Sequence, residues 1–250
     1  MDSSRADNTV LICTMPELTS RLYLAQTRRG GVPSSQLETL SEWMDAPILV
    51  GRPLPSDRAG MVFDGEQLRL HAPGNKGQLW HPGMAYRRIR WRQDALCRLL
   101  ELESEETVLD CTLGMGHDAL VMAHAGARVF SVEKNAAQLV YTAMGIQGYD
   151  PELARRIQFR RADMRTVLPT LADDSVDHVY IDPMFPSTKY EKHSQTWALL
   201  RQVHGGDKGP DKAVIREAIR VARRGVLIKL PPRSGPLHHE GLPKGIVVGS

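Results

Sequence analysis

Residues 181–186 read Ile-Asp-Pro-Met-Phe-Pro, a run whose side chains could act on an aromatic amine. Such an amine is a poor nucleophile because its lone pair is delocalised into the ring, so catalysis needs acceptors for both of its N–H groups. The carboxylate of Asp182 and the carbonyl oxygen of Pro183 could accept them, while Phe185 could stack on a planar base. We therefore predict these three as the catalytic residues. The alternative is a turn in which Phe185 only packs on the sheet edge.

A second constellation, over residues 110–118, reads Asp-Cys-Thr-Leu-Gly-Met-Gly-His-Asp. Gly114 and Gly116 let the backbone turn tightly and approach a ligand, and the helix that follows offers unpaired N–H groups at its start. With Ala119 they also satisfy the GxGxxG/A pattern of dinucleotide sites. The run therefore predicts a nucleotide-type cofactor site but does not by itself decide which cofactor binds.

Acidic residues follow at positions that such a site needs. Glu133, about 20 residues after the glycines, could bind two ribose hydroxyls, or it could be an exposed glutamate paired with Lys134. Asp163 could accept a hydrogen bond from an adenine amino group or cap the next helix. Asp110 and Asp118 could orient the glycine loop or meet a positively charged amine of the cofactor, with loop capping as the alternative.

The elements that would position these residues alternate along the chain from about residue 84. Helices are predicted over residues 85–102, 118–125, 136–144 and 213–222, and strands over 108–109, 128–132, 157–160, 176–181 and 225–230. This alternation implies right-handed crossovers and a doubly wound, mostly parallel sheet, which is a Rossmann-like α/β fold. Ligands of such sheets bind beyond the carboxyl ends of the strands, where both constellations fall.

The first 82 residues are predicted to form a small N-terminal α/β subdomain, and residues 83–250 the domain that carries the site. In the subdomain we expect a strand over 10–14, a helix after Pro16, a helical segment over 37–44 and a strand over 48–50. Asp64-Gly65, flanked by the segments 61–63 and 67–70, predicts a hairpin with a type I′ turn. The subdomain could recognise substrate or form a dimer.

Composition restricts the class of protein. With 32 Lys and Arg against 29 Asp and Glu, the net charge is +3, which only mildly favours a polyanionic partner. Arginine clusters around Trp91, at residues 155–161 and at 216–224 are typical of solvated faces as well as of RNA contacts. Three dispersed cysteines and nine histidines without ligand spacing predict neither disulfides nor a metal site. The absence of an apolar run of about 20 residues predicts a cytoplasmic protein.

The residues that follow the predicted strand 176–181 indicate which class of cofactor the glycine turn binds. Asp182-Pro183-Met184-Phe185 resembles the (Asp/Asn)-Pro-Pro-(Tyr/Phe) motif of methyltransferases that modify exocyclic amines of bases, with Met184 at the second proline. Taken with residues 83–88, 110–120, 133–134 and 228–237, it resembles the ribosomal small-subunit methyltransferase J family, which methylates a guanine N2 of 16S rRNA. The likeness covers about residues 80–237.

The resemblance implies a class I methyltransferase that depends on S-adenosylmethionine. It implies cofactor contacts from His117, Asp118, Glu133, Lys134, Asp163, Met164 and Asp182, beside the loop residues Asp110, Gly114 and Gly116. His117 stands where better-known members have arginine, Asp163-Met164 replaces small hydroxyl residues, and the usual last strand is expected to be missing. Residues predicted on the acceptor side are Arg87, Arg88, Lys229 and Arg233, with Lys229 or Arg233 meeting phosphate.

The predicted function is therefore N-methylation of a guanine in ribosomal RNA or in the assembled small subunit, by a monomer or a homodimer and with no membrane partner. Three alternatives stay open. The acceptor could be DNA, protein or a small molecule; the glycine loop could serve a nicotinamide-dependent oxidoreductase; or the chain could be a non-catalytic RNA-binding module that kept the fold.

Overall fold

The computed structural model describes most of the chain between residues 77 and 183 and shorter parts elsewhere. The described residues are 22–26, 38, 41–42, 48–50, 59–63, 68–71, 77–90, 94–183, 209–230 and 246–249. Several predicted features lie outside these ranges, namely the strand 10–14, the residues Met184 and Phe185, and Arg233.

Six strands form the larger sheet in the order β11-β10-β9-β6-β7-β8, and every neighbouring pair is parallel. The chain runs outward from β6 to β8 and then returns to β9 on the other side of β6, which creates the switch point of a doubly wound sheet. The predicted Rossmann-like fold class is confirmed. The strands are β6 (Thr107–Asp110), β7 (Arg128–Glu133), β8 (Ile157–Arg161), β9 (Val176–Ile181), β10 (Ala222–Lys229) and β11 (Ile246–Gly249).

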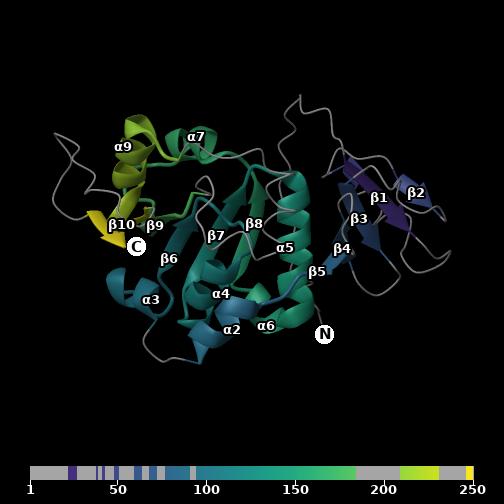
Figure 1. Ribbon diagram of the computed structural model, residues 1–250. Coiled ribbons are helices and arrows are strands. Elements are labelled where there is room, and N and C mark those ends of the chain that lie inside the picture. The colour runs from purple at the N-terminus through teal and green to yellow at the C-terminus, as the bar shows by residue number, and fades with distance from the viewer. Residues whose placement is uncertain are drawn as a thin grey trace, which may run out of the picture.

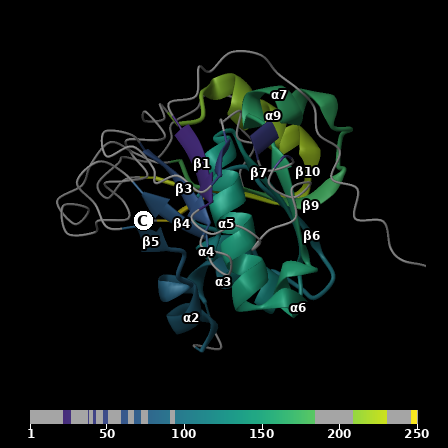
Figure 2. The ribbon, with the colours of Figure 1, turned by 90° about the vertical axis from the view of Figure 1, so that its right-hand side faces the viewer.

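Helices cover both faces of this sheet, and α7 and α9 lie on the opposite side of the molecule from α2 and α6 (Figures 1 and 2). Successive residues of β9 alternate between the two cores, because Val179 and Ile181 pack with α7 and α9 while Tyr180 packs with the others. This two-sided burial explains the adjacent apolar residues of the central strands, such as Val179, Tyr180 and Ile181 in β9. The helices are α2 (Gly83–Ile89), α3 (Ala95–Leu99), α4 (His117–His124), α5 (Ala136–Tyr149), α6 (Pro151–Ala154), α7 (Met164–Val167) and α9 (Lys212–Val221).

Polar side chains fix where several helices begin. Asn135 accepts a hydrogen bond from the backbone N–H of Gln138 at 3.0 Å, and Asp211 accepts one from Ala213 at 2.9 Å. Such a cap also overturns one prediction, a single helix over residues 85–102. Asp94 has extended backbone angles (φ −63°, ψ 136°) and caps a new helix, so the segment is divided into α2 and α3.

The smaller sheet has the order β2-β1-β3-β4-β5. Its hairpin is confirmed, since β3 and β4 are antiparallel with Phe63 opposite Leu68. The strand over 48–50 is also confirmed, and residues 38, 41 and 42 are helical as predicted. However, β1 occupies part of the stretch after Pro16 that was expected to be helical, because it pairs in parallel with both β2 and β3. The strands are β1 (Leu22–Gln26), β2 (Ile48–Val50), β3 (Ala59–Phe63), β4 (Leu68–His71) and β5 (Gln78–Leu79).

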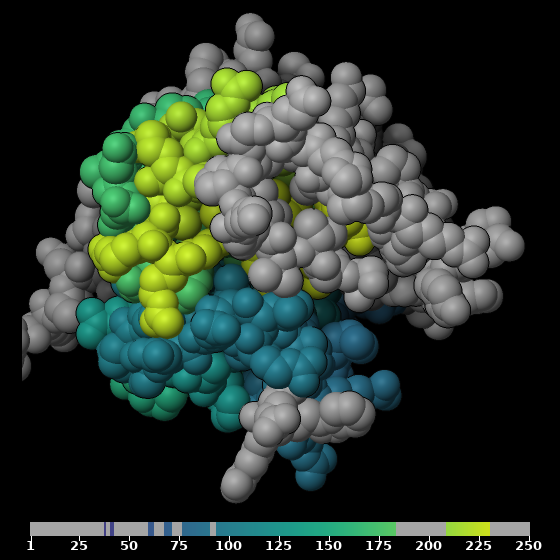
Figure 3. Space-filling view, turned by 90° about the vertical axis from the view of Figure 1, so that its left-hand side faces the viewer, coloured from purple at the N-terminus to yellow at the C-terminus, as the bar shows by residue number. Residues whose placement is uncertain are grey.

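Helix α5 lies between the two sheets in Figure 1, and the hydroxyl of Tyr141 on this helix donates to the carbonyl of Gln78 in β5 at 3.2 Å. At the far edge of the larger sheet, sequence analysis does not predict β11, which pairs with β10 from Val226 opposite Ile246 to Lys229 opposite Gly249. On the face in Figure 3, residues 209–230 (yellow-green) lie against the blue and teal surface. Arg224 of β10 forms ion pairs with Glu103 and Glu106.

Candidate functional site

The chain leaves β6 through a tight turn that its glycines make possible. Gly114 (φ 51°) and Gly116 (φ 70°) both have left-handed backbone, which other residues adopt at a cost. A Cβ on Gly116 would lie 2.5 Å from Ile146 Cδ1 and 2.7 Å from Thr142 Cγ2, so the turn packs directly against α5. Among the described residues, the nearest atom to a Cβ on Gly114 would be the Thr112 carbonyl oxygen at 3.7 Å, so these residues leave space beside this glycine.

Asp110 holds the glycine turn from inside the protein. The residue is 1% exposed, and its carboxylate accepts hydrogen bonds from the Thr112 backbone N–H and the Ser131 hydroxyl, each at 3.0 Å. Burial, with the negative charges of Asp118 and Asp182, raises the pKa of Asp110 to about 7. These contacts are those of a residue that orients the loop.

Glu133 ends β7 beside the same turn. Its Oε2 accepts a hydrogen bond from the Gly114 N–H at 3.2 Å, and its Oε1 accepts one from the Asn135 N–H at 2.8 Å. Because Glu133 is 6% exposed, the alternative of an exposed glutamate does not fit. The strand-end acid and the glycine turn therefore form one unit, as the cofactor prediction requires.

Two residues of α5 that sequence analysis does not single out complete this unit. The amide of Gln138 and the hydroxyl of Thr142 both donate to the carbonyl of Gly114, at 2.7 and 2.6 Å. Both side chains are buried, so these bonds are shielded from water. The available signal was a pair of polar residues four positions apart in an otherwise apolar helix.

The predicted acceptor turn lies directly beside the glycine turn. The backbone N–H of Asp182 donates to the Thr112 hydroxyl oxygen at 2.6 Å, and the Cys111 N–H donates to the Tyr180 carbonyl at 2.9 Å. Pro183 is buried. Phe185 lies outside the described residues, so its stacking role stays a prediction.

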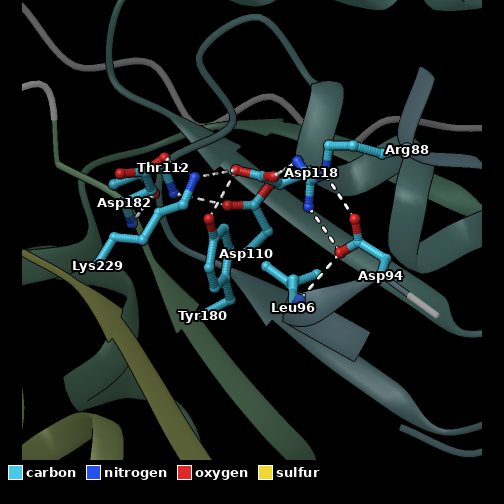
Figure 4. Close-up of polar contacts among 9 residues, drawn as sticks. All are labelled: Arg88, Asp94, Leu96, Asp110, Thr112, Asp118, Tyr180, Asp182 and Lys229. Atoms are coloured by element: carbon cyan, nitrogen blue, oxygen red, sulfur yellow. Dashed lines mark hydrogen bonds and ion pairs between the residues drawn. The ribbon is translucent and has the colours of Figure 1, made fainter. Parts of the chain in front are cut away.

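Asp118, the second residue of α4, joins helices and strands around the site (Figure 4). One carboxylate oxygen bonds the guanidinium of Arg88 from α2; the other accepts from the Tyr180 hydroxyl at 2.6 Å and from the Lys229 ammonium at 3.0 Å. The same ammonium lies 2.7 Å from Asp182 Oδ2. Asp182 and Asp118 thus share one cation.

Arg88 connects this network to α3. Its Nε and Nη2 atoms donate to the two carboxylate oxygens of Asp94 at 2.7 and 2.8 Å, in addition to the bond with Asp118. The structure therefore places Arg88 among carboxylates of the fold, whereas Arg87 is exposed on the surface of α2.

Burial and ion pairing have opposite effects on the pKa values of Asp118, Asp182 and Lys229. Burial alone would raise the pKa of Asp118, but the charges of Lys229 and Arg88 lower it well below its usual range. Burial and the charge of Asp118 raise the pKa of Asp182 even though Lys229 opposes them. Burial would lower the pKa of Lys229, but the two carboxylates raise it. Lys229 is therefore charged at neutral pH, and Asp118 is ionised.

The other residues predicted to contact the cofactor lie around the same strand ends. His117 begins α4, its Nε2 lies 3.0 Å from the His81 carbonyl, and burial lowers the pKa of its imidazole. Lys134 follows Glu133 directly and is half-buried. Asp163 caps α7 by accepting a bond from the Arg165 N–H at 2.8 Å, which is the capping alternative. Met164 packs in the core with α9 and is 3% exposed.

Trp80 links the glycine turn to the chain that precedes α2. Its indole N–H donates to the Met115 carbonyl at 3.0 Å, and its ring lies 6.1 Å from those of His117 and Tyr149. Gly145 of α5 makes room for it, since a Cβ there would lie 2.2 Å from Trp80 Cγ. Sequence analysis places a boundary here and misses this contact.

Five arginines of the clusters at 155–161 and 216–224 form ion pairs with acids, which fits charge-paired faces better than RNA contacts at those five positions. A surface hollow at the start of β7 and β8 is lined by arginines and by Glu105 and Glu152 as well. The ion pairs are Arg155–Glu152 and Arg156–Glu105 at 2.9 Å, Arg220–Asp173 at 2.6 Å, Arg223–Asp177 and Arg224–Glu106.

Within the described part of the chain, no helix is both long and apolar enough to cross a membrane. The same residues contain no group of three or more His, Cys, Asp or Glu side chains arranged to hold a metal ion.

The sheet order, the glycine turn and the acid at the end of β7 define a Rossmann-like nucleotide-binding fold, and the turn after its fourth strand, β9, is bonded to the loop after β6. The family described as "Putative SAM-dependent methyltransferase" matches residues 63–246, and the chain belongs to this family. It is therefore a methyltransferase that depends on S-adenosylmethionine. This membership removes the nicotinamide alternative left open by the glycine pattern.

Several proteins of known sequence and one solved structure are similar to the chain. The chain is 30% identical to "Uncharacterized protein YpiP" of Bacillus subtilis, over 70% of this chain and 72% of that protein. It is 29% identical to "Ribosomal RNA small subunit methyltransferase J" of Halorhodospira halophila (79% and 80% of the chains) and 38% identical to the protein of that name from Laribacter hongkongensis (57% and 52%). A SAM-dependent methyltransferase from Neisseria gonorrhoeae shares the fold, with a TM-score of 0.57, 20% identity and 83% of each chain covered.

The residues at the strand ends fit this cofactor. Gly114 leaves space beside a left-handed turn, and the buried Glu133 is held there by backbone N–H groups, so an acceptor for ribose hydroxyls stands next to the start of α4. The carboxylates of Asp118 and Asp182 suit a ligand that carries positive charge.

Proposed function

We propose that the protein methylates the exocyclic N2 amine of a guanine in ribosomal RNA, free or within the small subunit, in the cytoplasm. One observation carries the proposal. Asp182, at the end of β9, is tied to the glycine turn by its 2.6 Å bond to Thr112, so an amine acceptor and a cofactor turn share one edge of the sheet. The names of the relatives from Halorhodospira halophila and Laribacter hongkongensis support the choice of RNA as acceptor.

When bound, S-adenosylmethionine supplies an electrophilic methyl group. The chain's own contribution is to bind and orient the amine. The Asp182 carboxylate and the Pro183 carbonyl accept its two N–H groups, which favours the tetrahedral nitrogen that reacts. Phe185 stacks on the base. No strong base is required, because the amine becomes acidic as it is alkylated, and positioning supplies most of the catalysis.

We assign cofactor binding to the residues around the glycine turn. Glu133 meets the ribose, Asp163 the adenine, and Asp118 a positively charged part of the cofactor, while Asp110 orients the loop. The remaining members of the set are Gly114, Gly116, His117, Lys134, Met164 and Asp182, of which Met164 can contribute through its backbone because its side chain is in the core.

Acceptor RNA is expected to approach over α2 and the end of β10. Arg87 is exposed on α2 beside Tyr86, which is 47% exposed and lies under the guanidinium of Arg90, 5.4 Å from ring centroid to Cζ. An arginine next to an exposed aromatic ring suits single-stranded RNA, which binds by stacking and charge. Arg233 is the remaining candidate for a phosphate contact, while Lys229 belongs to the acceptor side through its bonds to Asp182 and Asp118. The proposal also assigns recognition of the substrate to the subdomain formed by residues 1–82.

The test compares ribosomal RNA from cells that lack the protein with RNA from cells complemented by wild-type or Asp182→Ala protein. Nucleoside analysis by mass spectrometry, followed by mapping of the position, should show one N2-methylguanosine that is lost without the protein and restored only by the wild type. An unchanged set of modified guanosines in the deletion strain would contradict RNA as the acceptor. DNA, total protein and small metabolites from the same cells, incubated with labelled cofactor, would then identify the acceptor class.

A further inference from the structure

We propose that Lys229 is a positioning residue that keeps the Asp182 carboxylate ionised and able to accept a hydrogen bond from the amine, by placing its ammonium between Asp182 and Asp118. This rests on the proposed function, in which Asp182 binds the amine. This role of Lys229 differs from the phosphate contact predicted from the sequence.

The sheet itself brings the two residues together. Strands β9 and β10 are parallel neighbours with Ile181 opposite Ile228, so Asp182, the first residue after β9, lies beside Lys229, the last residue of β10. The Lys229 ammonium lies 2.7 Å from Asp182 Oδ2 and 3.0 Å from Asp118 Oδ2, and 5.9 Å from the centre of the Tyr180 ring (Figure 4). Because the Asp182 side chain is 33% exposed, a substrate amine can reach it from the side that Lys229 leaves open.

The charges around Asp182 are otherwise unfavourable to a carboxylate. Asp118 faces it from α4 and Asp110 stands at the end of β6, and both add negative potential. The hydroxyl of Tyr180, which precedes Asp182 on β9, donates its hydrogen bond to Asp118 and not to Asp182. Arg88 reaches Asp118 and Asp94. Among the described residues, Lys229 is therefore the cation that is bonded to Asp182.

Removing this ammonium would leave two neighbouring carboxylates without a shared counter-ion. Two carboxylates that lie side by side repel each other when both are ionised, so the pair would tend to bind one proton. Asp118 keeps the bonds from Arg88 and Tyr180, so the proton would go to Asp182. Burial and Asp118 already raise the pKa of Asp182 with Lys229 present, so the change is in the same direction. A protonated Asp182 would present an O–H donor where the amine needs an acceptor.

The experiment measures the titration of Asp182 directly and then its effect on transfer. Protein labelled with 13C at the aspartate carboxyl carbons is titrated by NMR, with the Asp182 signal assigned from Asp182→Asn. In Lys229→Met the midpoint should move upward by about one pH unit or more. Lys229→Arg keeps the charge and should return it most of the way to the wild-type value.

Methyl transfer by the wild type, Lys229→Met and Lys229→Arg is then measured over a range of pH. The acidic limb of the kcat profile should move upward with the NMR midpoint in Lys229→Met, while KM for RNA and its salt dependence stay as in the wild type. Lys229→Gln serves as a second neutral variant if Lys229→Met folds poorly, which thermal unfolding would reveal.

Two results would overturn the proposal. One is an Asp182 midpoint that is the same in wild type, Lys229→Met and Lys229→Gln. The other is a defect confined to the KM for RNA and the salt slope, which is the signature of a phosphate contact. The NMR titration needs neither RNA nor cofactor, so a shifted midpoint together with no guanine methylation by the wild type would reject the proposed acceptor and retain the charge role of Lys229.

Discussion

The hydroxyl oxygen of Thr112 accepts a hydrogen bond from the backbone N–H of Asp182 at 2.6 Å. This bond joins the loop after β6 to the turn after β9, two segments that are 70 residues apart in the chain. It fixes the backbone on which the Asp182 carboxylate is carried, next to the glycine turn. Several expectations follow from such contacts at the strand ends.

Replacing Thr112 by valine keeps the shape of the side chain but leaves the Asp182 N–H without this partner. The turn should lose its position, and kcat should fall by about tenfold to a hundredfold, equivalent to roughly 1.4–2.8 kcal/mol. Steady-state methylation assays measure the effect, and calorimetry with S-adenosylhomocysteine should show that cofactor affinity is retained. Thr112→Ser supplies a hydroxyl and should recover most of the rate. Wild-type kcat in Thr112→Val would show that the bond has no catalytic role.

The two glycines near the end of α5 should respond to alanine in opposite directions. A Cβ on Gly145 would lie 2.2 Å from Trp80 Cγ, so Gly145→Ala must displace the indole and should cost about 1–3 kcal/mol in the free energy of unfolding. A Cβ on Gly148 would meet nothing within 4 Å, so Gly148→Ala should stabilise the helix by about 0.5–1 kcal/mol. Urea unfolding followed by circular dichroism distinguishes them. Equal effects of the two changes would contradict the packing of Trp80 on α5.

The glycines of the cofactor turn form a second matched pair. Both have positive φ, so alanine costs about 1–2 kcal/mol of backbone strain at each. Gly116→Ala also forces a Cβ against Ile146 and Thr142 and should lose about 1–3 kcal/mol more than Gly114→Ala. Thermal and urea unfolding of the two variants measure this difference. If Gly114→Ala proves the less stable, the described packing of the turn on α5 is wrong.

The buried Asp110 should make stability depend on pH. Burial raises the pKa of Asp110 to about 7, so between about pH 4 and pH 7 the folded protein holds a proton that the unfolded chain releases. The contribution of this group to stability is therefore present at low pH and is lost as pH rises through that range. Asp110→Asn keeps an acceptor for Thr112 and cannot titrate.

The difference in unfolding free energy between Asp110→Asn and wild type should consequently shift in favour of the variant from about pH 5 to about pH 7. The limiting slope is about 1.4 kcal/mol per pH unit for one proton. Urea unfolding of both proteins at a series of pH values gives this difference. The other carboxylates are the same in the two proteins, so their contribution is removed by the subtraction. Parallel pH profiles for the two proteins would mean that Asp110 is ionised throughout.

Much of the larger sheet could be predicted because its signals are local. The strand 176–181 was predicted with the bounds that β9 has, since its apolar residues, Val176 and 179–181, are delimited by the polar residues 173–175 and by Asp182-Pro183. The glycine turn and Glu133 were likewise found from residue types and spacing. The break between α2 and α3 depends on the cap at Asp94, and β1 depends on pairing with β2 and β3, so an apolar pattern alone could not reveal either.

The contacts of the charged residues could not be predicted, because their partners are remote in the sequence. Lys229 and Asp118 are 111 residues apart, and only the adjacency of β9 and β10 with the start of α4 brings them together. Arg88 was predicted on the acceptor side from its place in an arginine cluster, yet it is bonded to Asp94 and Asp118. A charge cluster in the sequence does not show which of its members are neutralised in the fold.

The role of Asp182 as the acceptor of the amine hydrogens is tested most directly by single-turnover transfer from labelled S-adenosylmethionine to undermethylated small subunits, with wild-type and Asp182→Ala protein compared at saturating cofactor. The transfer rate should fall roughly a hundredfold or more in the variant, while calorimetry still detects S-adenosylhomocysteine binding. A wild-type rate of transfer by Asp182→Ala would contradict the assignment of catalysis to the end of β9.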